Sequence, residues 1–192
     1  MTAQISDIIF YSNNQYSIVA LEKELPFHPK NYGLEPQPVS TACYRGYYCE
    51  YSLIENQLVL SKLNIGLKED KPAINGIQPQ KGKHFETSGF WEYNDLNIPI
   101  DYSGGMVIGS QLILEFYIHM GFQRPHSFKE VFELIIDKGK LIECIDHSKR
   151  MEEIRDMIGK KRQSKDTSAI SHDDVSRFVE DSFSLSYEKK WF

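Results

Sequence analysis

Residues 44–65 read YRGYYCEYSLIENQLVLSKLNI. Aromatic and branched residues fill both arms of this stretch, and a Glu-Asn pair at 55–56 lies between them. Asn tolerates positive φ angles, so this pair suits a two-residue turn that returns the chain antiparallel to itself. Turning there places Leu53 opposite Leu58, which matches apolar side chains across the ladder. The stretch therefore predicts a β-hairpin.

Two further stretches also have sequence patterns typical of β-strands. Residues 129–146 predict a second hairpin that turns at 138–139, with Ile136 opposite Leu141. In this register Phe132 lies opposite Ile145. The strongest alternation is QLILEFYIHM at 111–120, where apolar and polar residues take turns with a period of two, as in a strand.

The two hairpins also resemble each other, and each follows another predicted hairpin. The upstream hairpins turn at 13–14 and at 109–110. One interpretation is a β body of two similar four-strand halves. The alternative is that any two hairpins with good turns look alike.

From residue 151 onward, the spacing of the apolar residues changes from that of a strand to that of a helix. Met151, Ile154 and Ile158 follow helical spacing, and a second helix is expected to begin at Ser171, an N-cap residue. Our expected fold is mainly β (α+β by class). It is an antiparallel β-barrel or a two-sheet sandwich of 8–10 strands, with two C-terminal helices. We expect residues 1–146 to form the β domain and 147–192 a helical appendage packed on it.

Composition limits the classes of protein. The chain has 192 residues, a net charge of −5, and 41% hydrophobic and 26% charged residues, which is ordinary for one globular domain. Its apolar runs are too short to span a bilayer, and its start lacks the pattern of a secretory signal. Three cysteines fit a reducing compartment. We expect a cytoplasmic protein, as in a bacterial accessory role, without a membrane partner.

Nucleic-acid, metal and cofactor binding are not expected. The basic run at 160–162 is small, while the whole chain is acidic. The His-Phe-Glu sequence at 84–86 has the spelling found in zinc deaminases, but the Pro-Cys-x-x-Cys that completes the zinc shell does not follow. The glycines at 104–105 precede a predicted strand rather than the helix that a phosphate loop needs.

Our first functional hypothesis is a non-catalytic binding protein. It would hold a small ligand in the barrel, or a protein partner on an aromatic face. Tyrosines near an arginine are typical of binding surfaces, although they are also normal at the edges of β cores. The candidate ligand-binding residues are Arg45, Tyr47, Tyr51, Trp91, Tyr102 and Tyr117.

Two alternatives remain open. Glu115, His119 and His126 would serve as an acid–base set on a small polar substrate if they meet around one substrate atom. On a strand, Glu115 and His119 lie about 13 Å apart, too far to bind one metal ion together. The third hypothesis is a homodimer formed through a terminal helix or the C-terminal aromatic residues.

Overall fold

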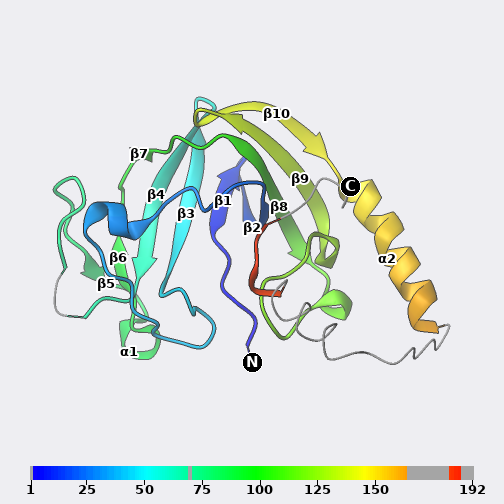
Figure 1. Cartoon of the computed structure of the whole chain (residues 1–192), viewed down its shortest axis with the longest axis horizontal. Coiled ribbons are helices and arrows are strands. Elements are labelled where there is room, and N and C mark those ends of the chain that lie inside the picture. The colour runs from blue at the N-terminus through cyan, green and yellow to red at the C-terminus, as the bar shows by residue number, and fades with distance from the viewer. Residues whose placement is uncertain (1, 69–70, 164–181, 187–192) are drawn as a thin grey trace.

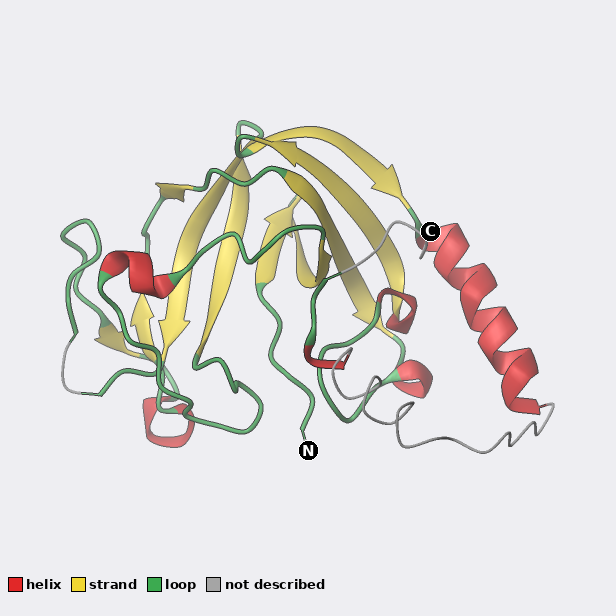
Figure 2. Ribbon diagram, viewed as in Figure 1, coloured by secondary structure: helices red, strands yellow, loops and turns green. Residues whose placement is uncertain are grey.

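The computed structural model describes residues 2–68, 71–163 and 182–186 (Figures 1 and 2). The strands are β1 (Ile8–Tyr11), β2 (Asn14–Leu21), β3 (Tyr47–Ile54), β4 (Gln57–Ile65), β5 (Gln80–Lys81), β6 (Trp91–Tyr93), β7 (Ile98–Pro99), β8 (Gly104–Leu112), β9 (Phe128–Asp137) and β10 (Lys140–Asp146). The α-helices are α1 (Phe85–Ser88) and α2 (Ser148–Gln163), and the short 3-10 helices are η1 (Pro29–Tyr32), η2 (Leu114–Phe116) and η3 (Pro125–Ser127).

Seven of the strands close into a barrel, in the order β10-β9-β8-β2-β1-β3-β4. The closure is the pairing of Lys140 in β10 with Gln57 in β4. Beside it, the amide of Leu58 donates to the Gly139 carbonyl at 2.7 Å. The barrel alternative of the predicted fold is therefore confirmed. The expectation of purely antiparallel pairing is wrong in one place, because β1 pairs with β3 in parallel.

The registers of the two predicted hairpins are confirmed near their turns. Leu53 pairs with Leu58, and Ile136 pairs with Leu141. The predicted pairing of Phe132 with Ile145 is wrong, because a β-bulge between Leu141 and Glu143 shifts the later register by one residue. A bulge adds one unpaired residue to one strand, which local alternation does not reveal. The relationship between the two halves stays a prediction.

The predicted strand at 111–120 is wrong, and so is the turn at 109–110. Strand β8 runs through 109–110 and ends at Leu112, and the chain then forms η2 and an irregular loop. Gln111 has a φ of 58°, in the left-handed region that an extended strand does not use. The alternation in the sequence does not correspond to alternate burial, because Leu112 and Leu114 are both exposed.

Buried side chains fill the barrel and also cover one outer face of the sheet. The interior holds a large apolar cluster that includes Ile9, Leu60 and Leu134. Outside it, Met151 of α2 packs against Val131 of β9 and its neighbours. Helix α2 confirms the first predicted C-terminal helix and lies along the side of the barrel (Figure 1). The helix expected at Ser171 lies outside the described residues.

The N-terminal segment and the 182–186 segment are linked at one opening of the barrel through the 121–122 loop. The amide of Gln4 donates to the Gly121 carbonyl at 2.8 Å, and the amide of Phe122 donates to the Ser182 carbonyl at 2.7 Å. The amide of Leu21 donates to the Leu185 carbonyl at 2.6 Å. These bonds join the N-terminal segment, the 121–122 loop and the 182–186 segment below the strands (Figure 1). They form the frame of a pocket.

Candidate ligand pocket at the barrel end

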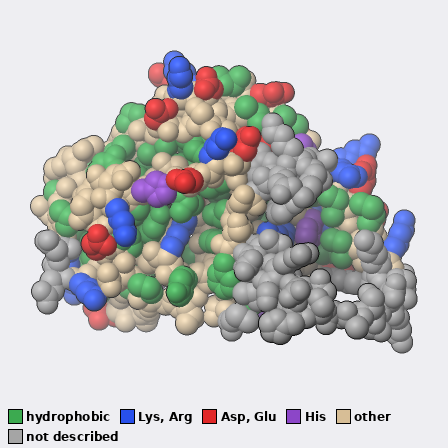
Figure 3. Space-filling model, in the orientation of Figure 1, with side chains coloured by type: hydrophobic (Ala, Val, Ile, Leu, Met, Phe, Trp, Pro, Cys, Tyr) green, Lys and Arg blue, Asp and Glu red, His purple; other side chains and the backbone are tan. Residues whose placement is uncertain are grey.

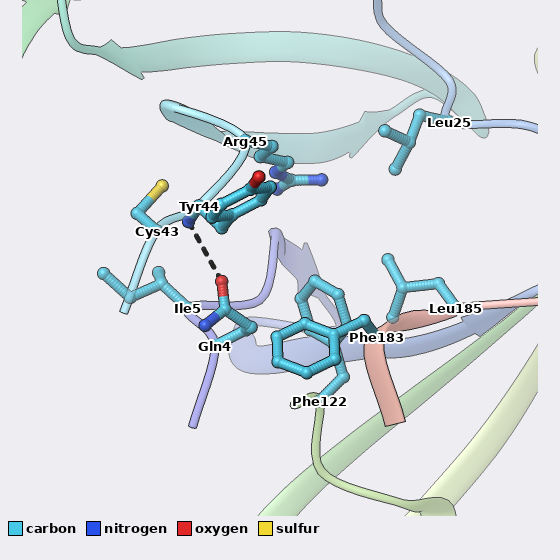
Figure 4. Close-up of a pocket in the computed structure, with 9 residues that line it drawn as sticks. All are labelled: Gln4, Ile5, Leu25, Cys43, Tyr44, Arg45, Phe122, Phe183 and Leu185. Atoms are coloured by element: carbon cyan, nitrogen blue, oxygen red, sulfur yellow. Dashed lines mark hydrogen bonds between the residues drawn. The ribbon is translucent and has the colours of Figure 1, made fainter. Parts of the chain in front are cut away.

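A largely apolar pocket of about 270 Å³ lies at this opening. Five separate parts of the chain line it: the N-terminal segment, the loop after β2, the loop before β3, the 121–122 loop and the 182–186 segment. The lining residues are Gln4, Ile5, Leu25, Cys43, Tyr44, Arg45, Phe122, Phe183 and Leu185. Figure 4 shows the rings of Phe122 and Phe183 facing the Tyr44 and Arg45 side across the gap.

Arg45 is the charged side chain of this pocket, and a buried carboxylate holds it. Its Nη2 makes an ion pair with Oδ1 of Asp7, whose side chain is only 1% exposed. The same Oδ1 accepts the amide of Cys49 at 2.6 Å. Burial alone would lower the pKa of Arg45, but the neighbouring Asp7 carboxylate raises it above its ordinary value. The guanidinium is therefore a permanent cation whose charge Asp7 already balances.

Backbone contacts fix the rest of the loop before β3. Nε of Arg45 donates to the Tyr47 carbonyl at 2.7 Å, and its guanidinium lies 4.7 Å from the centre of the Tyr47 ring. The Tyr44 amide donates to Oε1 of Gln4 at 3.0 Å, as Figure 4 shows. Gly46 has a φ of 80° and packs directly on the backbone of Gln37, so a side chain at this position would collide. The loop thus places Arg45 against the pocket in one orientation.

Two buried polar atoms around Asp7 have no hydrogen-bond partner among the described residues. They are Nη1 of Arg45 and the hydroxyl oxygen of Tyr51. Tyr51 is fully buried beside Cys49, and burial raises the pKa of both groups well above their ordinary values. Such orphaned groups are rare in native proteins and often mark functional sites.

Tyr51→Phe tests the cost of the orphaned hydroxyl. The Tyr51 hydroxyl has only the Cys49 thiol beside it, which is a weak hydrogen-bond partner. Its removal is therefore expected to change the free energy of unfolding by less than about 1 kcal/mol. Tyr102→Phe is the matched control, because the Tyr102 hydroxyl donates to the Gly105 carbonyl at 2.9 Å. That variant should lose about 1 kcal/mol. Urea unfolding measures both, and a loss in Tyr51→Phe equal to that of the control would show a hidden partner.

The cysteine in the pocket is not a nucleophile. Burial is the main cause that raises the pKa of Cys43, so its thiol stays protonated near neutral pH. Its Sγ donates to the Tyr47 carbonyl at 3.3 Å, which orients it as a structural group. A raised pKa disfavours the thiolate form of Cys43.

The structure divides the six predicted ligand-binding residues. Arg45 lines the pocket, and Tyr47 and Tyr51 lie in the cluster behind it. Trp91 stacks on Phe85, with ring centres 5.0 Å apart, away from the pocket lining. Three of the six predicted residues therefore belong to one constellation.

Tyr102 and Tyr117 lie outside this constellation. Tyr102 is buried, and its hydroxyl is bonded to Gly105. The Tyr117 ring packs edge-on against His119, with centres 4.9 Å apart. Neither is a lining residue of the pocket.

The three predicted acid–base residues are partly brought together. Glu115 is exposed in η2. Phe116, the next residue in the chain, packs edge-on against His126 of η3, with ring centres 6.2 Å apart. His119 is exposed beside Tyr117, in the loop that follows η2. Glu115 lines an open, charged groove between η2 and α2 that also includes Lys129. The acid–base role of the three residues stays a prediction.

Several pocket residues were not predicted. Gln4 and Ile5 precede the first strand, and Phe122 follows a glycine in an irregular loop. Phe183 and Leu185 come from the far end of the sequence. No local pattern marks any of them, because segments that are far apart in the sequence form the pocket together. The one local indication for Asp7 is that an acidic residue stands directly before an apolar strand.

Comparison with known proteins assigns no family: no family model, curated protein or solved structure matches the chain. Among the described residues, no group of three or more His, Cys, Asp or Glu side chains is placed to hold a metal ion. No helix in the described part of the chain is both long and apolar enough to cross a membrane. The geometry of the pocket therefore has to carry the functional assignment.

Proposed function

We propose that this is a non-catalytic binding protein that holds a small, mainly apolar ligand in the pocket at the barrel end. The observation that carries the proposal is a concave, aromatic-rich surface with one charged group, Arg45, among its lining residues. Small-molecule sites are typically apolar clefts with a few well-placed polar groups. The barrel interior is filled by side chains, so we place the ligand at the opening rather than inside.

Size narrows the class of ligand. The pocket volume of about 270 Å³ lies just below the range of roughly 300–1,000 Å³ that accommodates drug-sized molecules. A single aromatic ring or a short alkyl chain is therefore the expected body of the ligand. The rings of Phe122 and Phe183 offer flat surfaces on which such a ring can pack.

The other hypotheses have less support. Glu115 and His119 are both exposed, so acid–base chemistry there would take place in open solvent, where proton transfer gains little from the protein. The visible face mixes acidic, basic and hydrophobic side chains (Figure 3), which favours no single charged partner. Ligand binding at the pocket needs neither an acid–base group nor a charged partner surface.

A ligand titration with a pocket-filling variant tests the proposal. Acetophenone, a single-ring probe, should shift the amide NMR signals of Ile5 and Phe122 and raise the melting temperature as the probe concentration passes its Kd. Leu25→Trp should abolish both effects, because the larger side chain occupies the pocket. Leu114→Trp is the control, since Leu114 is 83% exposed and outside the pocket lining.

The proposal fails if neither acetophenone nor ethylbenzene shifts pocket signals at millimolar concentration. It also fails if Leu25→Trp binds the probe as tightly as the wild-type protein does. Signals that move only around η2 and α2 would place the site in the charged groove instead.

A further inference from the structure

The hydrogen bonds of Arg45, a lining residue of the pocket, leave one of its nitrogens without a partner among the described residues. A guanidinium has five N–H donors in a fixed fork. Nη2 is used by Asp7 and Nε by the Tyr47 carbonyl. Nη1 carries two N–H groups, is buried, and has no partner among the described residues. An unpaired buried donor is costly, so a ligand that offers an acceptor oxygen gains by satisfying it.

The charge of the site decides which kind of acceptor fits. Asp7 is buried and already balances the guanidinium, and none of the other eight lining residues is charged. A ligand carboxylate would place a second anion beside one cation in apolar surroundings, and burying an uncompensated charge is strongly unfavourable. A neutral carbonyl oxygen accepts the same hydrogen bond without adding charge.

Nη1 is buried, so a ligand reaches it only if side chains at the pocket edge move, and two neighbouring side chains there are partly or largely exposed. The Arg45 side chain is 18% exposed, and its chain neighbour Tyr44 is 76% exposed. Tyr44 is held through its backbone amide, and no hydrogen bond of its hydroxyl holds the ring among the described contacts. Exposed side chains change rotamer on the picosecond to nanosecond timescale, so the ring can move aside when a ligand enters.

We infer that the pocket selects an uncharged ligand, with a single ring or short alkyl body, whose carbonyl oxygen accepts a hydrogen bond from Nη1 of Arg45. This inference rests on the proposed function and adds the polar specificity of the site. Arg45 then determines specificity by donating a hydrogen bond to an uncharged ligand, because Asp7 already balances its positive charge.

Three probes of similar shape separate the possibilities in the wild-type protein. Acetophenone offers a neutral carbonyl, ethylbenzene lacks an acceptor, and benzoate carries a carboxylate. A hydrogen bond to a charged donor predicts that acetophenone binds at least about tenfold more tightly than ethylbenzene. Benzoate should bind most weakly, and NMR titration at pH 7 gives all three affinities.

The outcomes distinguish this inference from the proposed function. Equal binding of acetophenone and ethylbenzene overturns the role of Nη1 but leaves the pocket as an apolar site. Tightest binding of benzoate overturns the selection of a neutral ligand. The absence of binding by all three probes removes the proposed function itself.

Arg45→Lys provides the matched variant. Lysine keeps a positive charge against Asp7 but lacks a second nitrogen for the ligand. The preference for acetophenone over ethylbenzene, measured as the ratio of the two affinities within the same variant, should disappear. Arg150→Lys is the control, because Arg150 is exposed on α2 and pairs with Glu153. A retained preference in a folded Arg45→Lys variant contradicts the inference, and if that variant does not fold, the wild-type ranking of the three probes decides.

Discussion

Asp7→Asn is expected to lower the free energy of unfolding by about 3–5 kcal/mol. Asn keeps the shape and one acceptor oxygen, so the amide of Cys49 and Nη2 of Arg45 can still donate to it. What is lost is the negative charge that balances Arg45, whose side chain is only 18% exposed. An uncompensated charge on a mostly buried side chain lowers the free energy of unfolding strongly, whereas an ion pair on the surface would contribute little to it.

The control for this prediction removes both charges. Asp7→Asn combined with Arg45→Gln leaves no buried ion, so the double variant should be more stable than Asp7→Asn alone. Urea unfolding of the wild-type protein, both single variants and the double variant forms a double-mutant cycle that isolates the pair. A loss below about 1 kcal/mol in Asp7→Asn, or strictly additive losses, would show that the pair contributes little.

Gly139→Ala should destabilise the protein by about 3 kcal/mol, because it acts at the closure of the barrel. Gly139 has a φ of 77°, where an L-residue costs about 1–2 kcal/mol. A Cβ there would also overlap the Ile100 carbonyl oxygen, and the turn would have to move away. That movement weakens two hydrogen bonds, from Leu58 to the Gly139 carbonyl and from Gly139 to the Tyr102 carbonyl, each worth about 1 kcal/mol.

Gly76→Ala separates the two causes. Gly76 has a φ of 81°, but nothing lies within 4 Å of a Cβ built there. It should therefore lose only the backbone term of about 1–2 kcal/mol. Hydrogen exchange at the Leu58 amide should accelerate in Gly139→Ala and not in Gly76→Ala. Equal losses in the two variants would mean that the closing turn adapts without cost.

The sequence predicts this fold best where one local pattern contains both partners. The hairpin at 44–65 has its turn and its matched side chains within one stretch, so its register near the turn could be worked out without a structure. A β-bulge between Glu50 and Tyr51, which the pattern does not reveal, shifts the register beyond that point. The 111–120 segment shows the limit of such patterns. Its alternation is as regular as that of a real strand, but Gln111 adopts a left-handed conformation and the chain leaves the sheet.

The same physical reason limits the prediction of the site. Arg45 and its neighbouring tyrosines stand out because aromatic residues and an arginine cluster in sequence. Their partner Asp7 and the pocket wall at Leu185 are distant along the chain, and only the folded barrel brings them together. The choice of a neutral ligand depends on counting the donors of one side chain, which requires coordinates.

The closure between β4 and β10 has a consequence for synthesis of the chain on the ribosome. Strand β4 is complete at Ile65, but its partner at Lys140 emerges much later. Until then the rim of β4 near its first residue presents unsatisfied amides to other nascent chains. Contacts between distant positions also slow folding, because the entropy of loop closure is lost before they form.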